Sequence, residues 1–457
     1  MKLVDVPARC FHGVVPTIMA TCAADGTPNV TYLSEVVRVD ERHVALSCQF
    51  FNKTKRNVLE NPHATIEMYD PASFEAYRLE IRFDHEEKAG PLFDAMRVRI
   101  DAIASHTGMS GVFKLKSADV YEVVGVELRE GYLDGSGIDE PVASEVSDVR
   151  PRSEVRGIQL ISQRVCSART LDELLGTLLQ ALDDVLGFQH AMVLMPDETG
   201  GKLFVVASRG YEDTGVGAEV AVGEGLIGTV ARERRMLRMS GVENELRYGR
   251  TIRAGVSRTR ERGRLAPEIP LAGLADAQST MALPLVANDR LVGVLAVESR
   301  ARMAFEEWHE AFLEIVAGQV ALAIDNVVLR EREAEDEDDG PAPRPSQVGL
   351  ETAKSLRYFA GEECVFVGDE YLIRNVPAKI LWKLLREHQK GRTAFTNREL
   401  RVDPFIGLPP LRDNLESRLV LLRKRLEEKC PEIQLIPTGR GRFRLDVACA
   451  LALEERA

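Results

Sequence analysis

The sequence predicts a multidomain α+β protein with three successive domains. The chain has 457 residues, and domains of soluble proteins average roughly 150 residues each. Short strand-like segments fill residues 1–135, mixed helix and hairpin patterns fill 154–330, and a helix followed by a basic hairpin lies within 351–447. A run rich in acids and prolines at 331–350 cannot form a core and predicts a linker before the last domain.

Composition restricts the class of protein. The chain is 45% hydrophobic and 28% charged, as in ordinary soluble domains. No uninterrupted apolar run approaches the ~18–20 residues that span a bilayer, and the first residues lack a signal-peptide core. The seven cysteines are scattered, with no CxxC pair and no metal-ligand spacing. We therefore expect a cytoplasmic protein with no membrane segment, no metal site and no disulfide framework.

The first domain opens as a β-meander. Apolar segments between Val15 and Phe50 are separated by turn residues at Asp25-Gly26 and at 40–42. A polar stretch at 52–57 then leads into a short helix that ends at Asn61-Pro62. Two more strands, a helix around 91–104 and a last strand-rich segment complete the pattern, and its opening is a β-meander rather than a βαβ unit.

This order resembles the pyridoxamine 5'-phosphate oxidase-like split barrel, on the turn DGTPNV, the segment KTKRN and the Asn-Pro that follows it. The resemblance implies a barrel that holds FMN at a homodimer interface, with the flavin phosphate on Lys53, Thr54, Lys55 and Asn57. A phosphate needs converging cations, hydroxyl groups and backbone donors, and a helix start supplies the last of these. The alternative is a solvated loop of mixed charge.

No residue of the barrel is predicted to be catalytic. The segment Ala104–Met109 is a candidate second ligand-facing loop, and we interpret His106 within it as an incidental loop histidine. Because no set of side chains for pyridoxamine phosphate is recognisable, an authentic oxidase is not expected.

The middle domain combines long helices with two hairpins. Thr170 and Glu173 form a capping box, and Gly200-Gly201 marks the first hairpin turn. The segments Gly223–Gly228, Ala282–Leu285 and Arg290–Ser299 resemble those of a GAF domain, an α/β sandwich that senses a small molecule or a protein. The resemblance leaves the GAF ligand unknown, because neither a bilin-attaching cysteine nor a cyclic-nucleotide signature is present.

Two features of this domain have open interpretations. The insertion 247–279 is rich in arginine and is either an anion-binding lid or a disordered surface loop. The apolar stripe on the last helix, from Ala317 to Val328, fits a seam between two subunits, although packing within one domain accounts for part of it. With the barrel, this stripe predicts a homodimer.

A helix with one apolar stripe begins the last segment of the third domain. Leu415, Leu419, Leu422 and Leu426 recur at helical spacing, and a Gly-rich hairpin turn follows at 438–441. Between 346 and 447 the chain carries 19 basic and 14 acidic residues, against a net charge of -12 for the whole. Phosphate contacts act within a Debye length of ~10 Å, so a locally basic domain on an acidic body is compatible with DNA binding.

With the strands and helices from Leu356 onward, this segment resembles the winged helix-turn-helix domain of OmpR/PhoB-type response regulators, on the LxxLRxxL of the helix and the Gly-Arg-Gly of the turn. The resemblance implies DNA contacts from one helix face and from the wing. The residues expected to contact DNA are Asn414, Ser417, Arg418, Val420 and Lys424 on the helix and Arg440 and Arg442 on the wing. The alternative is an ordinary amphipathic helix.

These assignments predict a cytoplasmic transcriptional regulator, in which a barrel and a GAF domain sense flavin or another small molecule and control a DNA-binding domain. Two other classes remain open at this point. One is a flavin-dependent oxidoreductase regulated by its GAF domain, and the other is a signalling scaffold whose winged helix binds protein.

Overall fold

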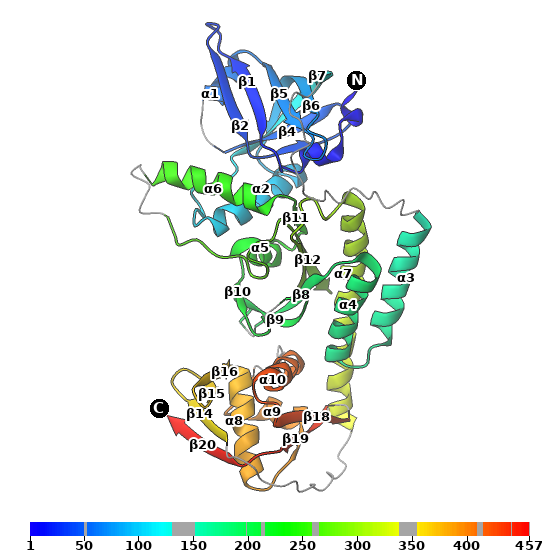
Figure 1. Cartoon of the computed structure of the whole chain (residues 1–457), viewed down its shortest axis with the longest axis vertical. Helices are drawn as coiled ribbons and strands as arrows, with labels where there is room; N and C mark the ends of the chain where they lie inside the picture. The colour runs from blue at the N-terminus through cyan, green and yellow to red at the C-terminus, as the bar shows by residue number, and fades with distance from the viewer. Residues whose placement is uncertain are drawn as a thin grey trace. The chain divides into compact units, whose positions relative to one another are not determined.

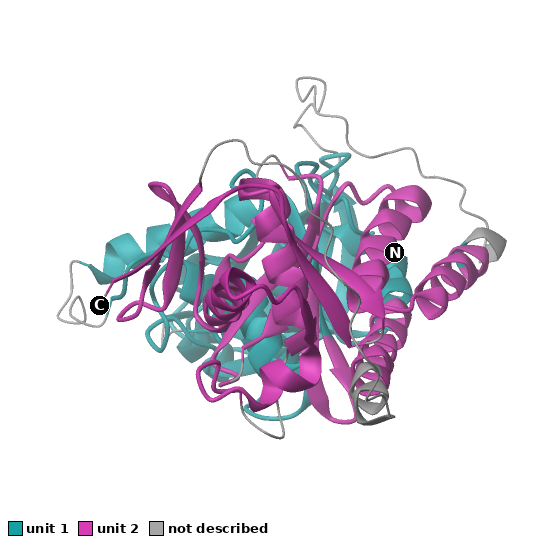
Figure 2. Cartoon of the chain, turned by 90° about the horizontal axis from the view of Figure 1, so that it is seen from below, with its two compact units in different colours: residues 1–154, 222–284, 296–314 teal, residues 155–221, 285–295, 315–457 magenta. Residues whose placement is uncertain are grey.

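The computed structural model describes residues 1–49, 53–129, 151–197, 199–211, 215–257, 265–337, 354–408, 415–439 and 441–456, without the side chains of 151–153 and 331–337. The chain divides into two compact units (Figure 2). Unit 1 comprises Met1–Glu154, Val222–Pro284 and Ala296–Glu314, and unit 2 comprises Val155–Ala221, Leu285–Leu295 and Ile315–Ala457.

The N-terminal part of unit 1 is a curled sheet with strand order β2-β1-β5-β6-β7-β4-β3 (Figure 1). All of its recorded strand pairings are antiparallel. Its elements are η1 (Leu3–Asp5), η2 (Ala8–Phe11), β1 (Thr17–Cys22), β2 (Pro28–Leu33), β3 (Val36–Arg38), β4 (His43–Cys48), α1 (Lys53–Glu60), β5 (His63–Tyr69), β6 (Ala76–Glu87), α2 (Pro91–His106) and β7 (Ser117–Arg129). The β-meander and the helix before Asn61-Pro62 therefore form as predicted.

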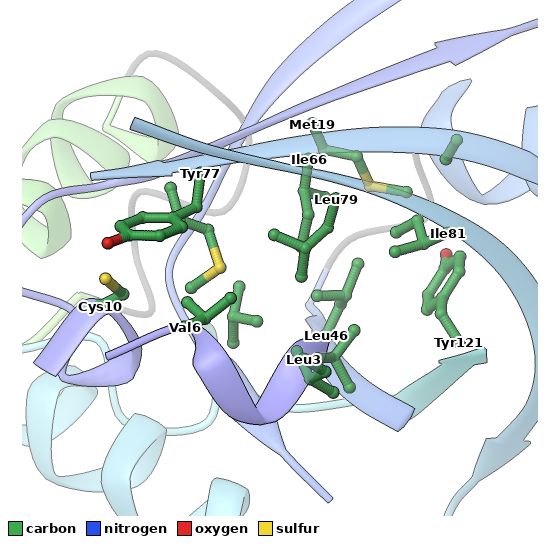
Figure 3. Close-up of a cluster of buried hydrophobic side chains, with 14 of the residues drawn as sticks. Leu3, Val6, Cys10, Met19, Leu46, Ile66, Tyr77, Leu79, Ile81 and Tyr121 are labelled. Atoms are coloured by element: carbon green, nitrogen blue, oxygen red, sulfur yellow. The ribbon is translucent and has the colours of Figure 1, made fainter. Parts of the chain in front are cut away.

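The core of this sheet is completed by the first ten residues of the chain. Leu3, Val6 and Cys10 point into the concave side, toward Ile66 and Leu79 of the sheet (Figure 3). All five side chains are less than 5% exposed. Apolar side chains on alternate strand positions leave one face to be covered, and the two short 3-10 helices supply part of that cover.

Residues 151–337 contain a sheet of order β10-β9-β8-β13-β12-β11. The elements are α3 (Pro151–Ser167), α4 (Leu171–Leu186), β8 (His190–Pro196), β9 (Lys202–Arg209), β10 (Glu219–Ala221), α5 (Gly225–Glu233), β11 (Leu237–Met239), α6 (Val242–Val256), β12 (Ser279–Ala287), β13 (Arg290–Ser299) and α7 (Glu307–Glu337). The predicted cap is present, because the Thr170 side chain accepts a hydrogen bond from Glu173 N–H. Asn288 and Asp289 both have positive φ in the β12–β13 turn, as a two-residue hairpin requires.

One helix differs from the expectation about apolar segments. Within α7, Glu307–Arg330 is long and apolar enough to cross a membrane by length and composition. Its residues Leu313, Val316, Val320 and Ile324 are at most 1% exposed inside the protein. Core helices pass the same length and composition test, so this segment is weak evidence for a membrane span.

The C-terminal part of unit 2 contains two small sheets around three helices. The elements are β14 (Lys354–Phe359), β15 (Cys364–Val367), β16 (Glu370–Arg374), α8 (Val376–Gln389), β17 (Ala394–Thr396), α9 (Asn397–Val402), α10 (Leu415–Lys429), β18 (Ile433–Gly439), β19 (Arg442–Val447) and β20 (Leu451–Arg456). The sheets have the orders β16-β15-β14-β20 and β17-β19-β18. Strand β20 pairs in parallel with β14, so this domain extends to Arg456, beyond the predicted end at residue 447.

Candidate functional site

The predicted phosphate-binding residues lie on α1, and two of them point inward. Thr54 and Asn57 are buried. Asn57 Nδ2 donates to Thr21 Oγ1 at 3.1 Å, and Asn29 Nδ2 donates to Thr54 Oγ1 at 3.0 Å. These polar groups therefore join α1 to strands β1 and β2 instead of converging on an open anion site.

Lys55 is held by two carboxylates. Its Nζ atom lies 2.7 Å from Asp119 Oδ1, 2.9 Å from Glu86 Oε2 and 4.8 Å from the centroid of the Phe83 ring. Burial alone would lower the pKa of this lysine, but the hydrogen bonds to Asp119 and Glu86 raise it, so the ammonium group stays charged. Two carboxylates beside one cation leave a local negative charge, which repels phosphate.

The adjoining space is also small. A cavity of about 90 Å³ is lined by Lys55, Asp119, Tyr121 and Tyr248, among others. Pockets for drug-sized ligands typically measure ~300–1,000 Å³. Lys53 Nζ donates to Pro28 O at 3.3 Å. The described residues of one chain therefore do not form a site that fits the phosphate of FMN.

His106 is part of a contact between the barrel helix α2 and the start of α5 in the GAF segment. Gly225 N–H donates to Ser105 Oγ at 2.8 Å, and Leu226 N–H donates to His106 Nε2 at 2.9 Å. His106 Nδ1 in turn donates to Ile269 O at 3.0 Å. The first N–H groups of a helix have no partner inside the helix, and here side chains of the barrel satisfy two of them. The interpretation of His106 as incidental is therefore wrong.

Steric constraints explain why residue 225 at this contact is a glycine. Gly225 has φ +62, and a Cβ atom built there would lie 2.9 Å from His106 Cε1. Glycine allows both the backbone conformation and the close approach of the imidazole ring.

Replacing His106 with alanine is expected to lower the free energy of unfolding by roughly 2–4 kcal/mol, because the buried Leu226 N–H and Ile269 C=O each lose a hydrogen-bond partner. Burial lowers the pKa of His106, so the unfolded chain binds more protons below about pH 6.5 and wild type is expected to lose part of this stabilisation there. Thermal unfolding of the full-length protein at pH 7.5 and 5.5 measures both effects. Alanine at exposed His63 is the control, and equal melting of the two variants would contradict the prediction.

The arginine-rich insertion begins as helix α6 rather than as a loop. Arg247 and Arg250 pair with Glu243 and Glu268, at 2.6 and 3.0 Å. Arg253 Nη1 donates to two backbone carbonyls, those of Thr107 and Ala266. These three arginines are thus occupied by protein groups and do not form an anion-binding lid. Arg258, Arg260, Arg262 and Arg264 lie outside the described residues.

The predicted DNA-contacting face of α10 is covered by protein. Ser417, Arg418 and Val420 are 1%, 5% and 4% exposed. The guanidinium carbon of Arg418 lies 3.9 Å from the centroid of the Phe204 ring on β9, which is a cation–π contact. Lys424 Nζ lies 3.6 Å from Asp172 Oδ1 on α4. Asn414 and Arg440 lie outside the described residues, and Arg442 is half-buried at the start of β19.

Further contacts join the same two parts of unit 2. Arg374 Nη2 on β16 lies 2.6 Å from Glu219 Oε2 on β10, and Lys202 Nζ lies 2.8 Å from the same oxygen. The hydrogen bonds from Lys202 and Arg374 outweigh burial and lower the pKa of Glu219, which keeps the carboxylate charged. Beside these residues a cavity of about 550 Å³ is lined by Phe204, Arg374, Arg418 and Arg425, among others.

Sequence reasoning missed the partners in each of these contacts. Asp119, Glu86, Phe204 and Glu219 carry no local motif, and each meets its partner across a long stretch of chain. A charged residue inside a largely buried strand, such as Asp119 in β7, is a signal of this kind, because an unpaired carboxylate is costly to bury.

Comparison with known proteins identifies two of the three domains. Residues 170–324 match the family model described as "GAF domain", and residues 10–124 match the one described as "Pyridoxamine 5'-phosphate oxidase". The chain therefore contains a GAF sensory domain and a barrel of the flavin-binding type. No curated protein matches the chain.

Solved structures show only weak likeness. The GAF domain of the Acinetobacter phosphoenolpyruvate-protein phosphotransferase is 17% identical, with coverage of 39% of this chain and 97% of that chain and a TM-score of 0.31. An FMN-binding protein from Syntrophomonas wolfei is 18% identical, with coverage of 27% and 84% and a TM-score of 0.23. The free methionine-R-sulfoxide reductase of Neisseria meningitidis is 15% identical, with coverage of 39% and 91% and a TM-score of 0.31. These likenesses are too weak to indicate an activity.

Proposed function

We propose that this chain is a ligand-sensing regulator of the cytoplasm whose C-terminal winged helix binds DNA under the control of the GAF domain. The two matched families support the sensing part. The order of strands and helices from β14 to β19, and the excess of basic residues in that segment, support the DNA-binding part.

The burial of α10 carries this proposal. A helix that reads bases must enter the major groove, and it cannot do so while Arg418 lies on Phe204 and Lys424 faces Asp172. The contact thus corresponds to a form in which DNA binding is switched off. A ligand that binds more tightly to a form in which α10 is released from Phe204 and Asp172 would switch DNA binding on. The size of the shift is set by the ratio of the ligand's affinities for the released and the docked form.

The ligands and the oligomeric state that we propose come from the barrel and the GAF domain. The small-molecule ligand of the GAF domain is unidentified, and FMN is a candidate for the barrel through its family alone. Since the described residues of one chain do not fit the flavin phosphate, a flavin-dependent oxidoreductase is not favoured. A homodimer would present two winged helices to two half-sites of an operator.

Selection of genomic DNA by full-length protein tests the proposal. The double variant Arg418→Ala with Lys424→Ala is expected to abolish sequence-specific retention. It should also reduce the magnitude of the slope of log binding constant against log salt concentration by roughly 1–2. The same substitutions remove contacts that hold α10 on β9 and α4, and release alone would increase retention. A loss would therefore identify these side chains as DNA contacts.

The matched control removes two cations from α8 of the same domain, by Lys379→Ala with Arg386→Ala. We expect this variant to select the same sequences as wild type. If the α10 variant did so as well, or if wild type selected no sequence under any condition, DNA binding by α10 would be excluded.

A second candidate function rests on the same observation. The α10 face binds protein in this structure, so the C-terminal domain is also suited to a signalling scaffold whose partner replaces the GAF surface. This candidate predicts no salt-sensitive DNA binding by either form, together with competition between a protein partner and the GAF domain.

A further inference from the structure

A second cavity, of about 210 Å³, lies within unit 1 between the barrel and the GAF segment. Its lining comes from the barrel, from helix α2, from β11 and from the start of α7, and includes His12, Glu35, Arg99, Arg238 and Glu310. These residues lie outside the contacts of α10 that carry the proposed regulation. Two of their polar atoms are buried without a hydrogen-bond partner, Glu35 Oε2 and His12 Nδ1.

Glu35 is a buried carboxyl group that is uncharged at neutral pH. It lies between β2 and β3 and is 7% exposed. Burial raises its pKa to about 8, which Arg99 opposes and Glu245 reinforces. A protonated carboxyl group has an O–H donor, and the unpartnered Oε2 leaves this group free to bond a ligand.

His12 supplies a second donor, and its tautomer follows from its neighbour. Arg238 Nη2 lies 3.2 Å from His12 Nε2, and an arginine always donates, so Nε2 accepts. Burial, with the charges of Arg238, Arg99 and Arg9, lowers the pKa of His12 to about 3. The ring is therefore neutral, the proton lies on Nδ1, and this N–H group is the one without a partner.

The other charges around the cavity are compensated. Arg99 pairs with Glu245 and also donates to His12 O at 2.8 Å, and Arg238 pairs with Glu310. Arg9, the third cation near His12, lies 2.6 Å from Asp70. With Glu35 and His12 neutral, these pairs carry no net charge, so an anion that accepts two hydrogen bonds meets no uncompensated carboxylate.

The rest of the lining is apolar. Phe11, Leu92, Met96 and Leu237 are among the lining residues. At ~30 Å³ for each water-sized group, the cavity holds roughly seven such groups. This combination of a polar end and an apolar wall is typical of small-molecule sites.

We propose that this cavity binds a small monocarboxylate with an apolar body, whose carboxylate accepts hydrogen bonds from His12 Nδ1–H and from the protonated Glu35. The apolar body packs on Phe11, Leu92 and Met96. The site does not depend on DNA binding by the C-terminal domain, so it stands whether or not that output is correct.

Titration calorimetry of the full-length protein with 3-methylbutanoate and with benzoate tests the proposal. We expect binding at pH 6.5 that weakens about tenfold for each pH unit above about 8, because ionised Glu35 no longer donates and repels the ligand. The amide 3-methylbutanamide, which lacks the charge, is expected to bind at least tenfold more weakly.

Two variants locate the binding. Glu35→Gln keeps a donor and is expected to retain binding but to lose its pH dependence, whereas His12→Phe removes the N–H group and is expected to weaken binding at least tenfold. Glu80→Gln, at an exposed glutamate of the same sheet, is the control. Absence of binding by folded wild type at millimolar acid, equal binding of the amide, or an unchanged pH dependence in Glu35→Gln would each overturn the proposal and leave water as the occupant.

Discussion

Reversing the charges of Asp172 and Glu219 to lysine together is expected to raise DNA retention by the full-length protein about a hundredfold. Asp172 faces Arg423 and Lys424 of α10, and Glu219 faces Arg374 of β16. Each partly exposed pair contributes roughly 0.2–1 kcal/mol, and reversal replaces an attraction with a repulsion of similar size. Each reversal then shifts the equilibrium between docked and released α10 by about 1.4 kcal/mol, or tenfold. The free-energy changes at two separate sites add.

Retention of a selected DNA at fixed salt measures this shift, because the apparent dissociation constant varies inversely with the fraction of released α10. Adding Arg374→Glu to Glu219→Lys restores opposite charges and is expected to recover most of the docked form. Asp184→Lys, on the same helix as Asp172 and at similar exposure, is the control. Unchanged retention in the double reversal, with melting unchanged, would show that α10 is not sequestered by these contacts.

The barrel and the GAF domain could be predicted because their signals are local. Turn residues such as Asp25-Gly26 and Gly200-Gly201 stand between the strands that they join, and the N-cap hydrogen bond of Thr170 acts within one helical turn. Local propensity and tertiary structure agree at these points, so sequence patterns suffice.

The rest depended on contacts between distant segments. Strand β20 has a burial pattern of mostly exposed residues and pairs in parallel with β14, about a hundred residues earlier, so alternation alone does not reveal it. His106 accepts a hydrogen bond from Leu226 N–H, which lies 120 positions further along the chain. Nothing near His106 in the sequence indicates that it contacts helix α5.

The candidate sites show the same division. The segment of Lys53, Thr54, Lys55 and Asn57 was correctly placed at the start of a helix, but the carboxylates that neutralise Lys55 come from β6 and β7. Helical spacing places Ser417 and Val420 of α10 opposite the apolar stripe and Arg418 beside it. Helical spacing separates two faces of a helix but does not show whether both are covered.

Replacing Arg99 with methionine is expected to destabilise the barrel and its contact with α6 by about 3–5 kcal/mol, because it leaves a buried carboxylate without its partner. Arg99 pairs with Glu245, and their side chains are 14% and 5% exposed. Hydrogen exchange of the amides in α2 and α6 measures this local loss, which a single melting temperature of a multidomain chain would not resolve. Arg78→Met is the control, since its 3.6 Å pair with Glu67 is more exposed and should cost less than about 1 kcal/mol.

The cause of the destabilisation in Arg99→Met is either the unpaired charge of Glu245 or the packing lost with Arg99, and a double variant distinguishes the two. If it is the unpaired charge, then removing the second partner in Arg99→Met with Glu245→Leu should recover most of the stability, since two apolar groups need no counter-charge. A deficit that remains in the double variant would assign the effect to lost packing around Arg99.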